Sequence, residues 1–334
     1  MVRHVHPNHI RQRNPALSVS YLHRYLPTQS QPSRFVPYIE EHIGTDACYK
    51  LIREAGFDAV DVNLDHLLPP SEIKAGKRTD VFEGTDGEIL AHFAPWKEAA
   101  EKYGLDNYQA HAPFPSYVVD PAGEYNAYLM HVLEKTIMGC AYIGCRRLII
   151  HPFFLGYPDQ VDEKTEWETN ISRYAALIPA AKRYGVTICL ENMFKRYRGK
   201  IYAACCSDID AACRYVDTLN EMAGEKVFAF CLDTGHLLLT GQEVKAAMLR
   251  LGSRIEAFHV HDNDGWDDQH LAPYMGRLDW KRFAEGLREI GYSGTLSFET
   301  FNVMNVVDRE LWPQALSFIE QTGRLFARRA QAGV

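Results

Sequence analysis

The sequence lacks the features that mark membrane, secreted and nucleic-acid-binding proteins. Its apolar runs stay well short of the ~20 residues that a membrane-spanning helix needs, and the polar start MVRHVHPNHIRQRNP has no signal-peptide core. The eight cysteines include no CxxC pair, which is typical of a reduced, cytoplasmic protein. The net charge of -7 offers no attraction to a polyanion. We therefore expect a soluble, cytoplasmic protein with no membrane partner, and the charge also disfavours nucleic acid.

The chain also lacks any linker, low-complexity stretch or change of composition that would divide it. A length of 334 residues is enough for one large α/β barrel with a sizeable buried core. We therefore predict a single domain over residues 1–334, with residues 1–15 as an N-terminal extension.

Short β-branched, apolar segments alternate with segments of helical periodicity along the whole chain. The expected strands are residues 16–21, 57–63, 107–112, 146–151, 186–191, 227–233, 255–261 and 294–299. The expected helices are residues 44–55, 89–103, 124–143, 165–184, 207–222, 242–251, 279–290 and 309–329. Eight β-then-α units predict an α/β fold, a (β/α)8 TIM barrel with parallel strands. An open doubly wound sheet is disfavoured, because no GxGxxG motif follows the first strand.

The longest irregular segment is residues 64–88, which are rich in proline, glycine and charge. This segment follows the second expected strand. Because the loops after barrel strands surround the active site, we expect it to form a long loop over the catalytic face.

Four of the expected strands end in a side chain that can bind a metal: Glu191, Asp233, His261 and Glu299. Along these strands small residues alternate with bulky apolar ones, so the bulky residues face the helices and the small ones face the barrel axis. The terminal residue then points into the mouth of the barrel, where barrel enzymes hold their active sites. Converging carboxylates repel one another, and a bound divalent cation would remove that repulsion. His111 and His151 end two further strands, and His236 lies one turn beyond Asp233.

Short motifs at these strand ends resemble a known group of barrels. The motifs are HAPF, IIHPFF, LEN, LDTGH, HVHDN, DQHLAP, GRLDW and FET, in this order, and the resemblance covers about residues 45–300. They resemble the xylose-isomerase-like barrel superfamily, which includes sugar isomerases, tagatose/psicose 3-epimerases and the endonuclease IV family. The large subunits of bacterial C-glycoside deglycosidases resemble the same superfamily.

The resemblance to the epimerases implies one divalent metal bound by Glu191, Asp233, His261 and Glu299. It also implies that His236 contacts the substrate. We further predict Glu191, Glu299 and His151 as catalytic residues, and His111, Asp268 and His270 as additional contacts to the substrate. Oxygen-rich ligands with an imidazole favour Mn²⁺, with Mg²⁺, Co²⁺ or Zn²⁺ as alternatives. His111, His151, Asp268 and His270 also match the larger ligand set of endonuclease IV, but the GAHVS-like start of that family is absent.

Several polar residues near these motifs have two interpretations. Lys195, in the basic segment 194–200, is a candidate contact for an anionic substrate group, and a solvated loop or subunit contact is the alternative. His259 is expected to be a buried histidine that orients its neighbours rather than a ligand. Asp262 and Asn263 are expected in a turn, and Asp268 and His270 are either site residues or residues that hold a loop in place.

We therefore predict a metal-dependent carbohydrate enzyme that abstracts a proton next to a sugar carbonyl, as a sugar isomerase or epimerase does. A first alternative is a C-glycoside deglycosidase, a lyase that cleaves 3-oxo glycosides by β-elimination together with a small β-rich subunit. A second is an abasic-site nuclease of the endonuclease IV type, and a third is a barrel without catalytic activity. We expect a homo-oligomer, or a hetero-oligomer if the protein is a deglycosidase. The sequence leaves the substrate and its stereochemistry open.

Overall fold

Eight parallel strands close into a barrel, and their order around the ring follows the chain. The structure is a computed structural model that describes residues 18–22, 39–120, 122–157 and 159–332. The barrel strands are β1 (Ser18–Leu22), β2 (Ala59–Asn63), β3 (Asp106–His111), β4 (Arg147–Ile149), β5 (Thr187–Glu191), β8 (Phe228–Asp233), β9 (Ile255–Val260) and β10 (Thr295–Phe298). Ser20 of β1 is in register with both Ala59 of β2 and Ser297 of β10, which closes the ring. The predicted α/β TIM barrel with parallel strands is confirmed, while the expected extension 1–15 lies outside the described residues.

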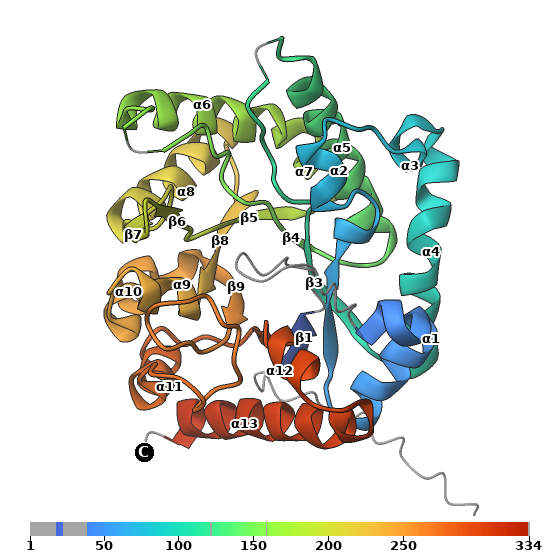
Figure 1. Cartoon of the computed structure of the whole chain (residues 1–334), viewed down its shortest axis with the longest axis vertical. Helices are drawn as coiled ribbons and strands as arrows, with labels where there is room; N and C mark the ends of the chain where they lie inside the picture. Colours follow the sequence, from blue (N-terminus) through green and yellow to red (C-terminus); the bar gives the residue numbers. More distant parts are fainter. Residues whose placement is uncertain (1–17, 23–38, 121, 158, 333–334) are drawn as a thin grey trace, which may run out of the picture.

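Helices surround the strands, as Figure 1 shows. They are α1 (Ile39–Glu54), α4 (Asp86–Tyr103), α5 (Glu124–Tyr142), α6 (Glu163–Ala176), α7 (Ile178–Tyr184), α8 (Ile209–Ala223), α10 (Val244–Leu251), α11 (Trp280–Glu289) and α13 (Trp312–Ala332). Pro179 at the start of α7 splits the helix expected over 165–184, because proline cannot donate a backbone hydrogen bond within a helix. None of the described helices combines the length and apolar character needed to cross a membrane.

Local sequence signals explain where many of these helices begin and end. Thr85 and Glu88 form a capping box at the start of α4, and Asp208 caps α8 through the backbone N–H of Ala211. Gly185 ends α7 with a φ of 62°, a left-handed conformation that glycine adopts without steric cost. A helix stop that is encoded locally therefore separates α7 from β5.

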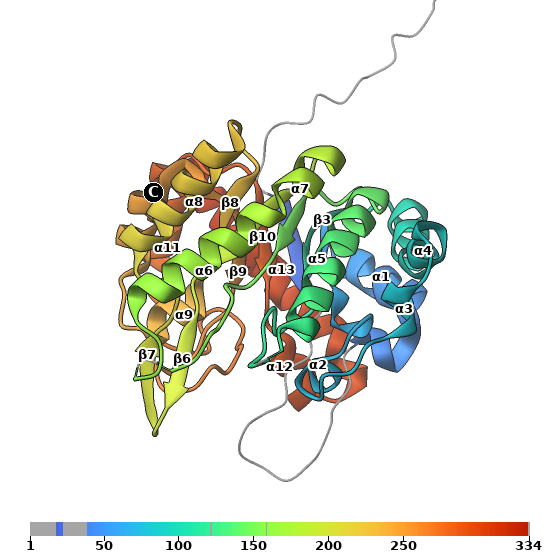
Figure 2. The ribbon, with the colours of Figure 1, turned by 90° about the horizontal axis from the view of Figure 1, so that it is seen from above.

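Further short elements gather at the carboxyl ends of the strands. They are η1 (Leu64–His66), α2 (Pro70–Lys74), α3 (Asp80–Glu83), the antiparallel pair β6 (Phe194–Tyr197) and β7 (Lys200–Ala203), α9 (Thr234–Leu239) and α12 (Phe301–Val306). Two more 3-10 turns, η2 (Gly252–Arg254) and η3 (Arg309–Leu311), precede β9 and α13. Figure 2 shows α2, α12 and the β6–β7 hairpin at one end of the barrel. Segment 64–88, expected to be irregular, instead contains three of these short helices.

The core has two separate apolar regions. The larger one lies between the strands and the surrounding helices and includes Phe228, Phe230 and Phe258. The smaller one lies inside the barrel and consists of Ile149, Cys189, Ala229, Cys231 and Ala257. The structure thus shows the alternation expected from the sequence, with bulky residues toward the helices and small ones toward the axis. All eight cysteines are free, buried thiols.

Candidate metal centre

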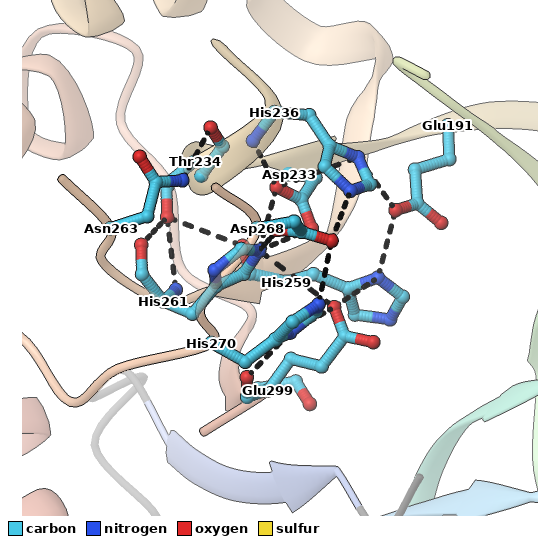
Figure 3. A network of polar contacts seen from close by, with 12 residues as sticks. Glu191, Asp233, Thr234, His236, His259, His261, Asn263, Asp268, His270 and Glu299 are labelled. Atoms are coloured by element: carbon cyan, nitrogen blue, oxygen red, sulfur yellow. Dashed lines mark hydrogen bonds and ion pairs between the residues drawn. The ribbon is translucent and has the colours of Figure 1, made fainter. Parts of the chain in front are cut away.

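The four strand-end residues expected to bind a metal lie together at the carboxyl end of the barrel (Figure 3). Glu191 and Asp233 are the last residues of β5 and β8, and His261 and Glu299 directly follow β9 and β10. All four are fully buried. His261 Nε2 lies 2.9 Å from Asp233 Oδ1 and 4.0 Å from Glu299 Oε2. The parallel register of the four strands therefore brings these side chains into one cluster.

His259, expected to be a supporting core residue, is part of the same cluster. Its Nδ1 lies 3.2 Å from Glu191 Oε1 and 3.6 Å from Glu299 Oε2. Ligand atoms of Glu191, Asp233, His259 and Glu299 all lie within 4.8 Å of one another. His261 belongs to neighbouring groups, one of them with Asp233 and His236. Two histidines therefore approach the three carboxylates: His259 within β9, and His261 directly after it.

His111 and His151 approach the cluster from β3 and the end of β4. The two Nε2 atoms are 2.8 Å apart, and His151 Nε2 is also 2.9 Å from Glu191 Oε2. His111 Nδ1 lies 2.7 Å from the carbonyl oxygen of Ala112. Because that carbonyl only accepts, His111 Nδ1 carries the proton of the neutral ring and its Nε2 faces His151. Both histidines are buried, so the structure places these two expected site residues against Glu191.

His236, Asp268 and His270 form the opposite wall of the cluster. Asp268 Oδ2 lies 2.9 Å from His270 Nε2 and 3.6 Å from His236 Nε2. The His270 ring stacks on that of His261, with centroids 4.1 Å apart, and its Nδ1 lies 3.0 Å from the carbonyl oxygen of Glu299. Asp268 and His270 therefore lie in the candidate site and do not merely hold a distant loop.

Acids and histidines in this wall stabilise each other's charge. Burial opposes protonation of His236, but Asp233 and Asp268 raise its pKa to about 10. Burial likewise opposes ionisation of Asp268, yet His270 and His236 hold the pKa of Asp268 well below its usual value. The buried carboxylates thus require positive charge beside them.

The donor set fits a divalent cation. Within the described chain, Glu191 Oε1 and the Nδ1 atoms of His259 and His261 are buried and form no hydrogen bond. Buried polar atoms are nearly always paired in proteins, so these atoms call for a partner. Carboxylate oxygens with imidazole nitrogens suit a hard or borderline ion. The groups His111–His151–Glu191 and His261–Asp268–His270 extend the set beyond a single four-ligand site.

Lys195, the expected contact for an anionic group, has other partners. Its Nζ lies 2.9 Å from Glu166 Oε1, donates to the carbonyl oxygen of Gly156, and sits 4.7 Å from the ring centroid of Phe154. The side chain is 8% exposed. The structure thus joins Lys195 to α6 and the loop after β4, and no contact to the metal-binding groups is among its described interactions. Its contact with substrate stays a prediction.

Asp262 and Asn263 do more than form a turn. The carboxylate of Asp262 is buried and accepts hydrogen bonds from the backbone N–H of Gly276, that of Leu278 and the indole of Trp280. Asn263 Nδ2 donates to the carbonyl oxygen of Gly235 in α9. These two residues fix the loop after β9 and hold it against α9.

Asp61 and Gln109 are buried polar residues of the barrel interior that the sequence analysis did not identify. Gln109 Nε2 donates to Asp61 Oδ2, and Ser297 Oγ donates to the same oxygen over 2.8 Å. Asp61 Oδ2 also lies 3.4 Å from His259 Nε2. Residues two positions apart in a strand share a face, and this rule could have identified both residues. Asp61 precedes Asn63 by two positions in β2, and Gln109 precedes His111 by two positions in β3.

The aromatic residues of the loops near the site differ in how far they are exposed. Phe153 is buried and packs against Tyr174, so it belongs to the core. Trp266 is 72% exposed and Tyr274 49% exposed, on the loop that follows β9. The ring of Tyr274 lies 5.9 Å from that of Phe326 in α13.

Comparison with known proteins identifies relatives of this barrel. A family model described as a xylose isomerase-like TIM barrel matches residues 9–322. The uncharacterized protein y4fM of Sinorhizobium fredii is 40% identical over 271 residues, which cover 75% of this chain and 79% of that protein. D-psicose 3-epimerase of Ruminiclostridium cellulolyticum is 26% identical over 149 residues, which cover 44% of this chain and 45% of the enzyme.

Solved structures show the same fold at lower sequence identity. The apo form of the 3-keto-D-glucoside 4-epimerase YcjR from E. coli has a TM-score of 0.64 and 15% identity, over 91% of this chain and 99% of that chain. An identity this low carries the fold only.

Proposed function

Because the chain belongs to the xylose isomerase-like TIM barrel family, we propose that it is a divalent-metal-dependent carbohydrate enzyme that abstracts a proton next to a sugar carbonyl. The observation that carries the proposal is the convergence of Glu191, Asp233 and Glu299 from three strands. Their ligand atoms and that of His259 in β9 all lie within 4.8 Å of one another. Epimerases are among the relatives of the chain, which agrees with this chemistry.

The proposed ligands are Glu191, Asp233, Glu299 and His261, with Mn²⁺ as the expected ion and Mg²⁺, Co²⁺ or Zn²⁺ as alternatives. A bound divalent cation supplies Lewis-acid stabilisation of the negative charge that develops on the carbonyl oxygen. The three carboxylates come from different strands and are fully buried, so their geometry is held by the barrel and needs little reorganisation.

Proton transfer is assigned to Glu191 and Glu299. One carboxylate takes the proton from the carbon next to the carbonyl and the other returns a proton, to the opposite face for epimerisation or to the neighbouring carbon for isomerisation. His151 Nε2, 2.9 Å from Glu191 Oε2, is placed to exchange a proton with that carboxylate. His111, His236, Asp268 and His270 surround these groups and are the proposed partners of substrate hydroxyl groups.

A lyase is the second candidate function. If the substrate is a 3-oxo glycoside, removal of the C2 proton leaves an electron pair on C2. This pair forms the C1–C2 double bond, and the bond from C1 to the aglycone breaks. The departing aglycone takes up a proton. Trp266 and Tyr274 expose aromatic surface on the loop after β9, and an aromatic aglycone would stack on a ring of this kind. In this case we expect a small β-rich partner subunit, and otherwise a homo-oligomer.

The test combines metal analysis with one substitution. We expect the purified protein to contain one divalent ion per chain and to convert a ketose or a 3-oxo glycoside. Glu299→Gln should lose the ion and lower turnover by about 10³-fold, because it removes both a ligand and a proton-transferring group. Glu221→Gln, on the exposed face of α8, is the matched control and should leave both unchanged.

Two results would contradict the proposal. A Glu299→Gln protein with normal turnover would rule out the metal centre. Two or three zinc ions per chain, together with cleavage of abasic DNA, would favour phosphodiester hydrolysis instead.

A further inference from the structure

A buried carboxylate lies inside the barrel, beneath the candidate metal centre. Asp61 of β2 is fully buried, although a buried carboxylate is costly unless it is paired. Two neutral groups hold its Oδ2, namely Gln109 Nε2 of β3 and Ser297 Oγ of β10. One donor comes from β3, the strand next to β2, and the other from β10, which lies beyond β1 in the ring. Together they fix the orientation of the carboxylate.

Among the described residues, His259 Nε2 also lies beside Asp61 Oδ2, at an ion-pair distance of 3.4 Å. The opposite nitrogen of the same ring, Nδ1, faces Glu191 Oε1 at 3.2 Å and Glu299 Oε2 at 3.6 Å (Figure 3). His259 is therefore placed between one carboxylate on its inner side and two on its outer side. The ring of His111 stacks on it, with centroids 5.9 Å apart and an interplanar angle of 26°, and this contact limits its rotation.

We propose that Asp61 is a positioning residue that holds the Nε2–H of His259, and that His259 Nδ1 is thereby a ligand of the metal centre beside Glu191 and Glu299. A histidine ligand commonly donates its other N–H to a carboxylate, which selects the tautomer and increases the basicity of the ligating nitrogen. The inference rests on the proposed metal centre. It adds a nitrogen ligand from the barrel interior to the four expected ligands.

The geometry explains why a cation is needed at this point. With Nε2 protonated toward Asp61, the lone pair of Nδ1 points at carboxylate oxygens, which also carry lone pairs. A cation held by His259, Glu191 and Glu299 would turn this repulsion into attraction. His259 and His261 are two residues apart and so share one face of β9. Both can therefore reach the same three carboxylates from different depths.

Metal affinity, rather than turnover alone, tests this inference. Mn²⁺ binding is measured by competition with a chelating dye, and the visible spectrum of the Co²⁺-loaded protein reports the ligand set. We expect Asp61→Asn to weaken Mn²⁺ binding by about 10- to 100-fold, and His259→Gln to weaken it at least as much and to change the Co²⁺ spectrum. In the double variant, Asp61→Asn should add little, because the carboxylate acts through His259.

Controls separate positioning from folding. Tyr49→Phe removes a buried hydrogen bond to Asn107 that joins α1 to the amino end of β3, whereas the ligands lie at the carboxyl ends of the strands, so it should lower thermal stability and leave Mn²⁺ affinity unchanged. Ser297→Ala removes one donor to Asp61 with little change in volume and should weaken Mn²⁺ binding several-fold. This milder variant keeps the test valid if Asp61→Asn does not fold.

Opposite results would overturn the inference. If Glu299→Gln loses the metal while Asp61→Asn and His259→Gln bind Mn²⁺ as the wild type does, the metal centre stands and the assignment of Asp61 and His259 falls. If Asp61→Asn weakens binding equally with and without His259, Asp61 does not act through that ring. If the wild-type protein binds no divalent ion, the proposed function itself fails.

Discussion

Gly235 determines how closely α9 approaches the candidate metal centre. A Cβ atom at this position would lie 2.0 Å from Cε1 and 2.4 Å from Nδ1 of His261. His261 cannot retreat freely, because its ring stacks on His270 at 4.1 Å and its Nε2 contacts Asp233. The DTGH motif therefore contributes both a carboxylate and the absence of a side chain.

We predict that Gly235→Ala displaces His261 and weakens Mn²⁺ binding by on the order of tenfold or more, with about 1–3 kcal/mol lost from the free energy of unfolding. Dye competition and thermal unfolding measure the two effects. Gly87→Ala is the matched control, since Gly87 also lies in the first turn of a helix but has no atom within 4 Å of the added Cβ. Unchanged metal affinity in Gly235→Ala would show that His261 is not required for binding.

Among the elements, the β6–β7 hairpin connects parts of the molecule that are distant in sequence. Lys195 binds Glu166 of α6, and Arg196 donates to the carbonyl oxygen of Trp266 and to Asp267 in the loop after β9. The ring of Phe194 lies 5.1 Å from that of His236. The hairpin therefore joins α6 to the rim of the candidate site.

We predict that Lys195→Met and Glu166→Gln each destabilise the protein by about 1–3 kcal/mol, because each leaves a mostly buried charge or polar group without its partner. Urea unfolding measures the change. The exposed pair Lys164–Glu168 on the same helix is the control, and Lys164→Met should change stability by less than about 0.5 kcal/mol. If Lys195→Met keeps its stability but no longer binds substrate, Lys195 is a substrate contact as the sequence predicted.

For the whole molecule, the proposed ligands couple four strands of the barrel. Glu191, Asp233, His261 and Glu299 come from the ends of β5, β8, β9 and β10, which lie side by side in the ring. A cation shared by these strands binds only when the barrel is closed. Metal binding and folding are therefore linked, since the unfolded chain cannot assemble the site.

We predict that Mn²⁺ at a hundred times its Kd stabilises the protein by about 2.7 kcal/mol, which corresponds to a rise in Tm of roughly 4 °C for a chain of this size. Scanning calorimetry with and without a chelator measures this shift. Glu299→Gln should show no shift, whereas Glu221→Gln should respond as the wild type does. A Tm that is independent of the ion would contradict the linkage.

Much of this protein is determined locally by its sequence. The eight strands and their following helices arise from residue periodicity and from helix-ending signals such as Gly185, which act over a few neighbours. The same period of two predicted small residues toward the barrel axis, where Cys189 and Cys231 lie, and placed Glu191 and Asp233 at the strand ends. These features could be predicted because each depends on the direction of a side chain along its own strand.

Only the tertiary structure decided which of these side chains meet. Asp61 and Ser297 are 236 positions apart and share a hydrogen bond because β1 alone separates their strands in the ring. Likewise His259 lies against Glu191 and Glu299, and Lys195 faces Glu166, because of the register of neighbouring strands and the path of the β6–β7 hairpin. Such contacts depend on how the barrel closes, a property of all eight strands together that no single strand encodes.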